Sequence, residues 1–176
     1  MNERFCASRW VLAMACSLTL TWAATASAQK VTTEFDDTVD FSKFKTFAVR
    51  DGQMNSAAPA LNSDLTKKRI TTAIERGLTA RGLTKADGPS DLNVFFTLGS
   101  SGVLKSEVIP AGPRGGARVV RLPGTEGTLV IGLRDPATRS LVWRGIASED
   151  KAKPVDILKK LDEMVRKIVD KYPPKK

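Results

Sequence analysis

Residues 127–147, GTLVIGLRDPATRSLVWRGIA, contain the pattern that decides the fold. Large apolar residues recur at every second position of the first half: Leu129, Ile131 and Leu133. This is the period of a strand with one buried face. Residues 135–139 begin with Asp and Pro, which are typical turn formers, and Leu141 and Trp143 then continue the apolar face. The stretch therefore predicts an antiparallel hairpin with strands at 128–134 and 141–147, in which Leu141 and Trp143 share a face with the first strand's apolar residues.

Three further strands are predicted upstream of this hairpin. Residues 31–35 and 92–98 alternate between apolar and polar residues, and residues 45–49 have the β-branched and aromatic content of a strand. Residues 51–59 contain Gly, Asn, Ser and Pro, and a loop is predicted there.

Two amphipathic helices are predicted. The first begins at Asn62-Ser63-Asp64, which supply N-cap chemistry, and runs to Arg81, with Gly82 in position for a left-handed cap. Gly77 costs roughly 1 kcal/mol relative to alanine inside a helix, so we expect a close approach to the sheet there. The second helix begins at Pro154, a position that proline tolerates, and ends before Pro173-Pro174. Its apolar stripe consists of Ile157, Leu158, Leu161, Met164, Val165, Ile168 and Tyr172.

Residues 99–127 differ in composition from the rest of the chain. They include seven glycines and three prolines, which favours a long mobile loop, with a short edge strand at 119–122. Four residues of the segment are basic, namely Lys105, Arg114, Arg118 and Arg121, and only Glu107 and Glu126 are acidic. A flexible basic loop on a rigid sheet suits contact with an acidic surface. The alternative is a disordered connector.

These elements together predict the fold class. Strands joined by tight turns pair antiparallel, and amphipathic helices cover a sheet face. We therefore expect an α+β fold, with a mainly antiparallel sheet of about five to six strands and two amphipathic helices packed on one face.

Residues 1–28 have the three parts of a secretory signal peptide. Arg4 and Arg9 form a basic start, residues 11–26 are largely apolar, and Ala26-Ser27-Ala28 offers a cleavage site. The apolar run is shorter than the roughly 20 residues of a spanning helix. We therefore expect residues 29–176 to form a single exported domain in the periplasm. The alternative is a lipid anchor on Cys16, because Ala13-Met14-Ala15-Cys16 resembles a lipoprotein box that lacks its usual leucine.

The exported chain would lack thiol and imidazole groups. Cys6 and Cys16 both precede residue 29, and the sequence contains no histidine. This composition excludes histidine-based triads and zinc sites built on His or Cys, and we predict neither a cofactor nor a metal.

The exported chain is also basic. Without Arg4, Arg9 and Glu3, the totals of 28 basic and 19 acidic residues become 26 and 18, a net charge of +8. Positive charge favours acidic partners, such as anionic lipid, lipopolysaccharide, glycan or another envelope protein. Nucleic acid is not an expected partner in that compartment. The alternative is surface charge that serves solubility.

Two patterns resemble catalytic sites. Ser148-Glu149-Asp150-Lys151 matches Ser-x-x-Lys of penicillin-binding enzymes, but the companion motifs are missing and no helix is predicted to begin at Ser148. Asp36, Asp37 and Asp40 cluster in sequence and could serve glycoside cleavage, although turn and cap chemistry explains them equally well. No catalytic residue is predicted.

Three pieces of the chain resemble a known family. They are residues 40–48 (DFSKFKTFA), residues 127–135 (GTLVIGLRD), and residues 141–145 (LVWRG) ahead of a helix that ends in Tyr172-Pro173-Pro174. Together they resemble the domain-of-unknown-function family 4136 (DUF4136), found in exported bacterial proteins, many of them lipoproteins. The resemblance implies structural roles for nine motif residues: Asp40, Phe41, Phe47, Gly127, Leu129, Asp135, Leu141, Trp143 and Gly145. Trp143 is expected in the core, with ligand stacking as the alternative, Gly145 at a close approach, and Asp135 at the start of a turn.

The resemblance implies no biochemical activity. We therefore expect a non-catalytic binding or structural module of the cell envelope, which contacts anionic components through the basic loop. Two alternatives stay open. One is a carrier that holds a small apolar or lipid ligand between helices and sheet, and the other is a hydrolase that uses carboxylates or a Ser/Lys pair.

Overall fold

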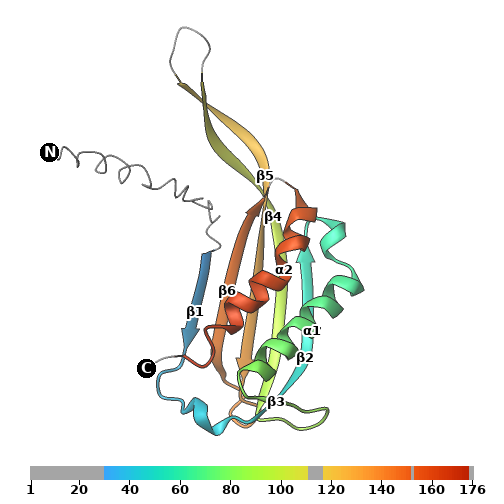
Figure 1. The fold of residues 1–176 in the computed structure, drawn as a ribbon, viewed down its shortest axis with the longest axis vertical. Helices are drawn as coiled ribbons and strands as arrows, with labels where there is room; N and C mark the ends of the chain where they lie inside the picture. The colour runs from blue at the N-terminus through green and yellow to red at the C-terminus, as the bar shows by residue number, and fades with distance from the viewer. Residues whose placement is uncertain (1–29, 111–116, 152, 175–176) are drawn as a thin grey trace, which may run out of the picture.

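The computed structural model describes residues 30–110, 117–151 and 153–174 (Figure 1). The predicted signal peptide, the Cys16 anchor and Arg114 lie outside these residues. The elements in chain order are β1 (Lys30–Phe35), the 3-10 helix η1 (Phe41–Lys43), β2 (Thr46–Ser56), the 3-10 helix η2 (Pro59–Leu61), α1 (Asp64–Ala80), β3 (Thr84–Lys85), β4 (Leu92–Pro110), β5 (Ala117–Arg134), β6 (Leu141–Lys151) and α2 (Pro154–Val169).

The strands form one sheet in the order β1-β6-β5-β4-β2-β3. The pairs β1–β6, β6–β5 and β5–β4 are antiparallel. β2 is instead parallel to both β3 and β4, because α1 carries the chain from the end of β2 back to the start of β4. The fold class is therefore confirmed as α+β, with a sheet that is mainly antiparallel.

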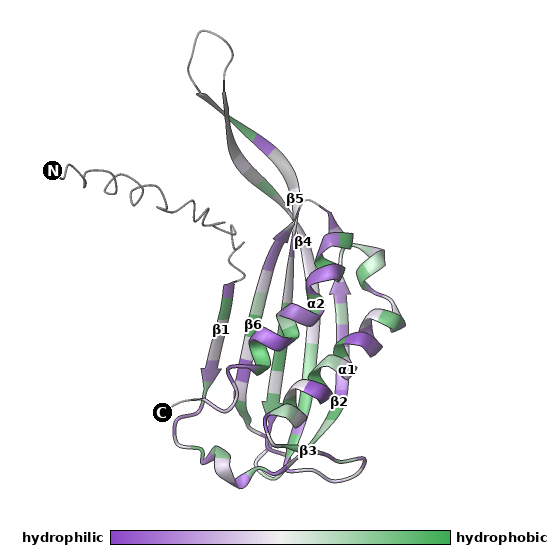
Figure 2. Ribbon diagram, viewed as in Figure 1, coloured by the Kyte–Doolittle hydropathy of each residue, from purple (hydrophilic) through white to green (hydrophobic). Residues whose placement is uncertain are grey.

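The core lies between the sheet and the two helices, which cover the same face (Figure 1). Helix-facing positions of the central strands are buried, as are the inner faces of both helices. The buried residues include Leu92, Val94, Phe96, Leu98, Leu129, Ile131, Leu133, Ile70, Ile74, Leu78, Ile157, Leu161, Met164, Val165 and Ile168. Figure 2 shows hydrophilic residues on the outward sides of α1 and α2. The helices therefore bury the apolar stripes that their sequence periods predict.

Local signals set the ends of α1. The Ser63 hydroxyl accepts a hydrogen bond from the Thr66 backbone N–H at 3.2 Å, which satisfies one of the orphan donors at the helix start. After the helix, Gly82 adopts a φ of +88°, the conformation that suits a glycine cap. The expected close approach at Gly77 is wrong in one respect, because a side chain there would meet Val169 of α2, at 3.1 Å, and not the sheet.

Two segments predicted as loops are largely strands. β2 continues to Ser56, and β4 and β5 extend through most of residues 99–127. The cause is pairing with distant partners: residues 51–56 pair with β4, and residues 99–110 pair one to one with residues 128–117. Ladder hydrogen bonds and cross-strand contacts outweigh the weak strand preference of glycine and proline. The predicted short strand at 119–122 is one part of β5.

The prediction that Leu141 lies on the same face of the sheet as Trp143 is also wrong. Leu133 pairs with Trp143 but Arg134 pairs with Leu141, so the ladder contains a bulge that skips Val142. A bulge adds one residue to one strand and shifts the alternation beyond it. Trp143 is therefore buried, whereas Leu141 is 45% exposed on the other face of the sheet.

Candidate functional site

Three of the four predicted basic residues of 99–127, Lys105, Arg118 and Arg121, lie on a hairpin that leaves the sheet. β2 stops pairing with β4 at Ser100, and β6 stops pairing with β5 at Thr125. Beyond these points, residues 102–110 and 117–124 pair only with each other among the described residues. These two segments are termed the arm, and Figure 1 shows it projecting beyond the rest of the sheet. Lys105 lies on its β4 strand, and Arg118 and Arg121 lie on its β5 strand.

Apolar and basic side chains share one face of the arm. Arg121 pairs with Ser106, and Leu104 and Val119 lie two positions away along their own strands, hence on the same face. Leu104 is 70% exposed and Val119 is 66% exposed, and Ser106 and Arg121 are exposed as well. The arm thus displays a guanidinium between two apolar side chains that remain in water.

Two of the three clustered carboxylates near β1, Asp36 and Asp40, accept hydrogen bonds from nearby backbone N–H and hydroxyl groups. One Asp36 oxygen accepts hydrogen bonds from the Thr38 backbone N–H at 2.9 Å and from its hydroxyl at 2.6 Å. Asp40 accepts from the backbone N–H and hydroxyl of Ser42 at 3.1 and 2.7 Å, at the start of η1. The hydroxyl and the backbone N–H of Thr38 lower the pKa of Asp36. These are turn and cap interactions, and they hold Asp36 in its ionised form.

Ser148 lies within β6, with its hydroxyl 3.3 Å from that of Thr128 on β5. The Ser-x-x-Lys motif of penicillin-binding enzymes requires a serine at the start of a helix, where Lys is one turn away. The strand therefore gives Ser148 a setting unlike that of the motif.

A groove of about 660 Å³ between the outer sides of α1 and α2 was not predicted from the sequence. Small and apolar residues line it, including Ala73, Gly77 and Val169, and its rim carries arginines and acids.

The rim acids are paired with the protein's own cations. Arg69 on α1 lies 2.7 Å from Asp162 on α2, and Lys160 and Lys167 each place their Nζ 2.8 Å from Glu163. Hydrogen bonds from Lys160 and Lys167 lower the pKa of Glu163 to about 2. A carboxylate with so low a pKa is a weak proton acceptor. The Arg69 pair joins α1 to α2, whereas the pairs of Glu163 with Lys160 and Lys167 lie within α2. The three- and four-residue spacing of Lys160, Glu163 and Lys167 is visible in the sequence, but the Arg69 pair depends on how the helices pack.

The aromatic residues of the family motif lie in the core. Phe41, Phe47 and Trp143 are buried. The Trp143 ring meets Tyr172 edge to face at 5.8 Å between centroids, and Tyr172 meets Phe41 in the same way at 5.9 Å. Trp143 therefore packs against the segment that ends the chain's last helix, with no face open to solvent.

The motif glycines lie beneath α2. A side chain at Gly127 would come within 2.7 Å of Ile157, and one at Gly145 within 2.4 Å of Ile168. The remaining motif residues include Asp135, whose carboxylate accepts from the Ala137 backbone N–H at 2.7 Å in the hairpin turn, and the buried Leu129.

Within residues 30–110, 117–151 and 153–174, no three acidic side chains are arranged to hold a metal ion. Neither helix in the described part of the chain combines the length and the hydropathy of a membrane-spanning segment.

Solved structures share this fold. A PDZ domain protein from Parabacteroides distasonis is similar with 17% identity and a TM-score of 0.56, over 83% of this chain. This chain spans only 36% of that protein's length. A DUF4136 family protein from Bacteroides thetaiotaomicron is similar with 14% identity and a TM-score of 0.54, over 82% of this chain and 96% of that one. Identities this low show the fold alone.

Comparison with curated proteins finds no match. A family model, in contrast, matches nearly all of the described chain. The family model of the domain of unknown function DUF4136 matches residues 31–174, from the second residue of β1 to the end of the described chain. The protein belongs to the DUF4136 family.

Proposed function

We propose that the protein is a non-catalytic binding module of the bacterial cell envelope that docks on anionic membrane lipid through the arm. The observation that carries this proposal is the exposed face of the arm, where Arg121 lies between Leu104 and Val119.

Exposed apolar groups on a projecting element favour an apolar environment. Burying a Leu or Val side chain stabilises a protein or complex by about 1.5–3 kcal/mol. Leu104 and Val119 are mostly exposed in the free chain, so that burial against a partner would stabilise the complex. A two-stranded ribbon is also marginally stable in water without a further layer. The headgroup and acyl boundary of a bilayer supplies such a layer, and the long side chain of Arg121 suits contact with lipid phosphates from there.

Charge supports the same partner. Between residues 102 and 124 the basic residues are Lys105, Arg114, Arg118 and Arg121, and Glu107 is the only acid. Each basic residue near an anionic bilayer contributes about 1 kcal/mol. The expected export through residues 1–28 would bring the arm to membranes rich in anionic lipid.

Flotation with lipid vesicles tests this function. The exported protein, from which residues 1–28 have been removed, should bind vesicles that contain phosphatidylglycerol more tightly than vesicles of phosphatidylcholine alone, and salt should weaken the binding. Replacing Lys105, Arg114, Arg118 and Arg121 together by Gln should weaken binding by at least about a hundredfold. A matched control replaces four exposed cations outside the arm by Gln: Lys43, Lys68, Arg76 and Lys153. This control should bind like the wild type.

A second variant separates apolar insertion from charge. Leu104→Ser combined with Val119→Ser keeps every charge, and it should weaken binding while the remaining binding stays sensitive to salt. Equal losses in the arm and control variants would refute the proposal. Binding to lipopolysaccharide or glycan without any binding to lipid vesicles would also contradict it, because the partner would then be a carbohydrate.

A further inference from the structure

β1 ends the sheet, and its outer edge has no partner strand in the described chain. The Asp36 backbone N–H donates to the Val142 carbonyl at 3.1 Å, in continuation of the register between β1 and β6. In an antiparallel ladder, hydrogen-bonded residues alternate. The even-numbered residues of β1 therefore bond to β6, and Val31, Thr33 and Phe35 direct their N–H and C=O groups outward.

This edge lacks two of the usual protections against pairing. Sheets guard their edges with proline, bulges, covering segments or charged side chains. β1 carries Lys30 and Glu34, but it pairs with β6 over its whole length without a bulge and contains no proline. Phe35 at its end is 40% exposed although it packs edge to face against Phe41. An open ladder and an exposed aromatic residue thus occupy the same strand.

We propose that β1 pairs antiparallel with β1 of a second copy of this chain, about a two-fold axis at Thr33. In this register Thr33 faces the partner's Thr33, Val31 faces the partner's Phe35, and Lys30 faces the partner's Asp36. Each outward residue then exchanges hydrogen bonds with its opposite, and the sheet runs continuously through both copies.

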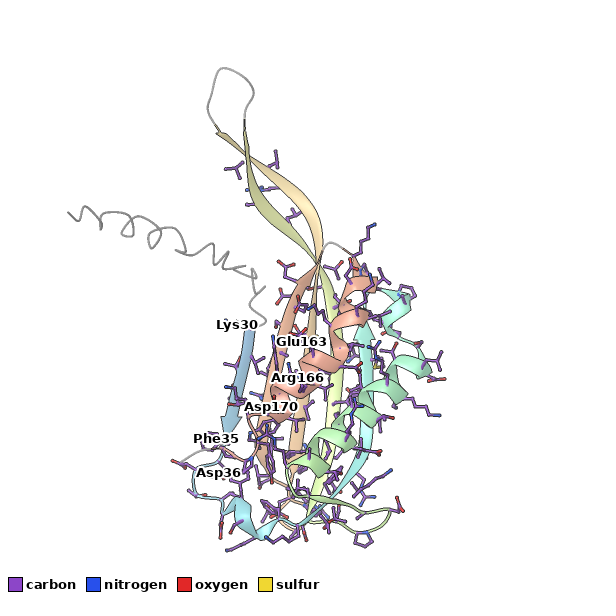
Figure 3. The ribbon with its side chains drawn as sticks, in the orientation of Figure 1. Lys30, Phe35, Asp36, Glu163, Arg166 and Asp170 are labelled. Carbon is purple, nitrogen blue, oxygen red and sulfur yellow. The ribbon has the colours of Figure 1, made fainter. Side chains whose placement is uncertain are left out.

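The sequence of β1 is complementary to itself in this arrangement. On the helix side, the apolar residue Val31 covers the exposed ring of the partner's Phe35, at both ends of the pair. On the open side, Lys30 and Asp36 lie at opposite ends of the strand (Figure 3), so that the two-fold axis brings each opposite the other. Moving the axis to Glu34 would place two glutamates face to face, which is unfavourable. Charge and apolar contact therefore select the same register.

This dimer directs its two arms to opposite ends, because β1 of one copy runs against β1 of the other. One arm of each dimer contacts a given membrane surface, and dimerisation is independent of the proposed lipid binding. It is measured without vesicles.

Sedimentation equilibrium of the exported protein, without residues 1–28, tests the dimer. We expect a reversible monomer–dimer equilibrium, and a chain that stays monomeric at about 1 mM overturns the proposal. Thr33→Pro removes the central outward donor and leaves the bonds to β6, which use the even-numbered residues. It should raise the dissociation constant at least about tenfold with the far-UV circular dichroism unchanged. A dimer that Thr33→Pro does not weaken also overturns the proposal.

Charge reversal tests the register independently, even if proline disturbs the strand. Lys30→Asp sets acids against acids at both ends of the pair, and Asp36→Lys sets bases against bases, so each variant alone should dimerise more weakly. An equimolar mixture of the two should dimerise again, because every acidic end then meets a basic one. Lys68→Asp reverses an exposed charge on α1 and should leave the equilibrium unchanged. A mixture that stays monomeric, or a dimer indifferent to both reversals, overturns the register.

Discussion

Replacement of Gly145 by alanine tests how closely α2 packs on the sheet. A Cβ atom at this position would lie 2.4 Å from Ile168 Cγ2 and 2.7 Å from Trp143 Cη2, distances below the 3.0 Å that real Cβ atoms keep. Both neighbours are buried in the core. Neither can therefore turn into solvent, and the added methyl group has to displace α2, the indole ring or β6 itself.

The expected loss follows from this crowding. Overpacking a core costs typically about 1–3 kcal/mol, and because two rigid neighbours must move, we expect about 3 kcal/mol in the free energy of unfolding. This is a large share of the roughly 5–15 kcal/mol that stabilise a domain. For a domain of this size it corresponds to a melting temperature lower by about 6–12 °C.

Urea denaturation followed by far-UV circular dichroism measures the loss, with Gly102→Ala as the control. Gly102 lies at the base of the arm, and no atom of the described part of the chain would come within 4 Å of a Cβ added there, so its replacement should change stability by less than about 0.5 kcal/mol. In an Ile168→Ala background, the further cost of Gly145→Ala should fall by at least about 1 kcal/mol, because the nearest clash is gone while the clash with Trp143 remains. A Gly145→Ala variant as stable as the control, or one whose cost is the same in both backgrounds, would show that α2 does not crowd this position.

Three further changes have defined outcomes. The buried Tyr172 hydroxyl has no hydrogen-bond partner among the described residues, and burial raises its pKa to about 12. Tyr172→Phe should therefore leave stability in urea unchanged or raise it by up to about 1 kcal/mol, and a loss of stability would contradict this expectation. Since Lys160 and Lys167 lower the pKa of Glu163 from 4.5 to about 2, its ionised form stabilises the fold above pH 4.5 and this contribution is lost as the pH falls towards 2. The contribution is small because the Glu163 side chain is 32% exposed; an NMR titration should show its pKa rising towards 4.5 when both lysines become Gln, and an unchanged pKa would contradict the pairing. Gly82→Ala places a side chain at a φ of +88° and should cost about 1 kcal/mol in thermal melts, whereas an unchanged melt would mean that the turn relaxes.

Local sequence patterns predicted correctly the elements whose stabilising interactions join residues close together in the chain. The Ser63 cap, the apolar period and Gly82 act over one or two helical turns, and the predicted helix at 62–81 agrees with α1. The same holds for the hairpin of β5 and β6, whose turn residues stand next to one another in the chain.

Prediction failed where pairing with a strand far away in the sequence determines the local structure. The glycines and prolines of 99–127 favour a loop when taken alone, yet residues 99–110 find a complete register of partners in β5. The bulge that turns Leu141 outward likewise depends on how β6 meets β5, and alternation in one strand carries no sign of it.

The candidate site also combines features that the local sequence predicts with features that depend on strand pairing. Lys105, Arg118 and Arg121 could be named from charge, but only the register places Arg121 between Leu104 and Val119 on an exposed face. The free edge of β1 was equally hidden, because a strand does not reveal from its own sequence whether it lies inside a sheet or ends it.

The amino-acid sequence by itself determined the α+β class, the two helices, the family and the absence of imidazole, since each depends on composition or on periods shorter than a strand or helix. Tertiary structure alone decided the strand order, the projecting arm and the open edge at β1. These features arise from backbone pairing between residues far apart in the chain. Nearly every residue has the same backbone N–H and C=O groups, so the local sequence gives little information about which strands pair.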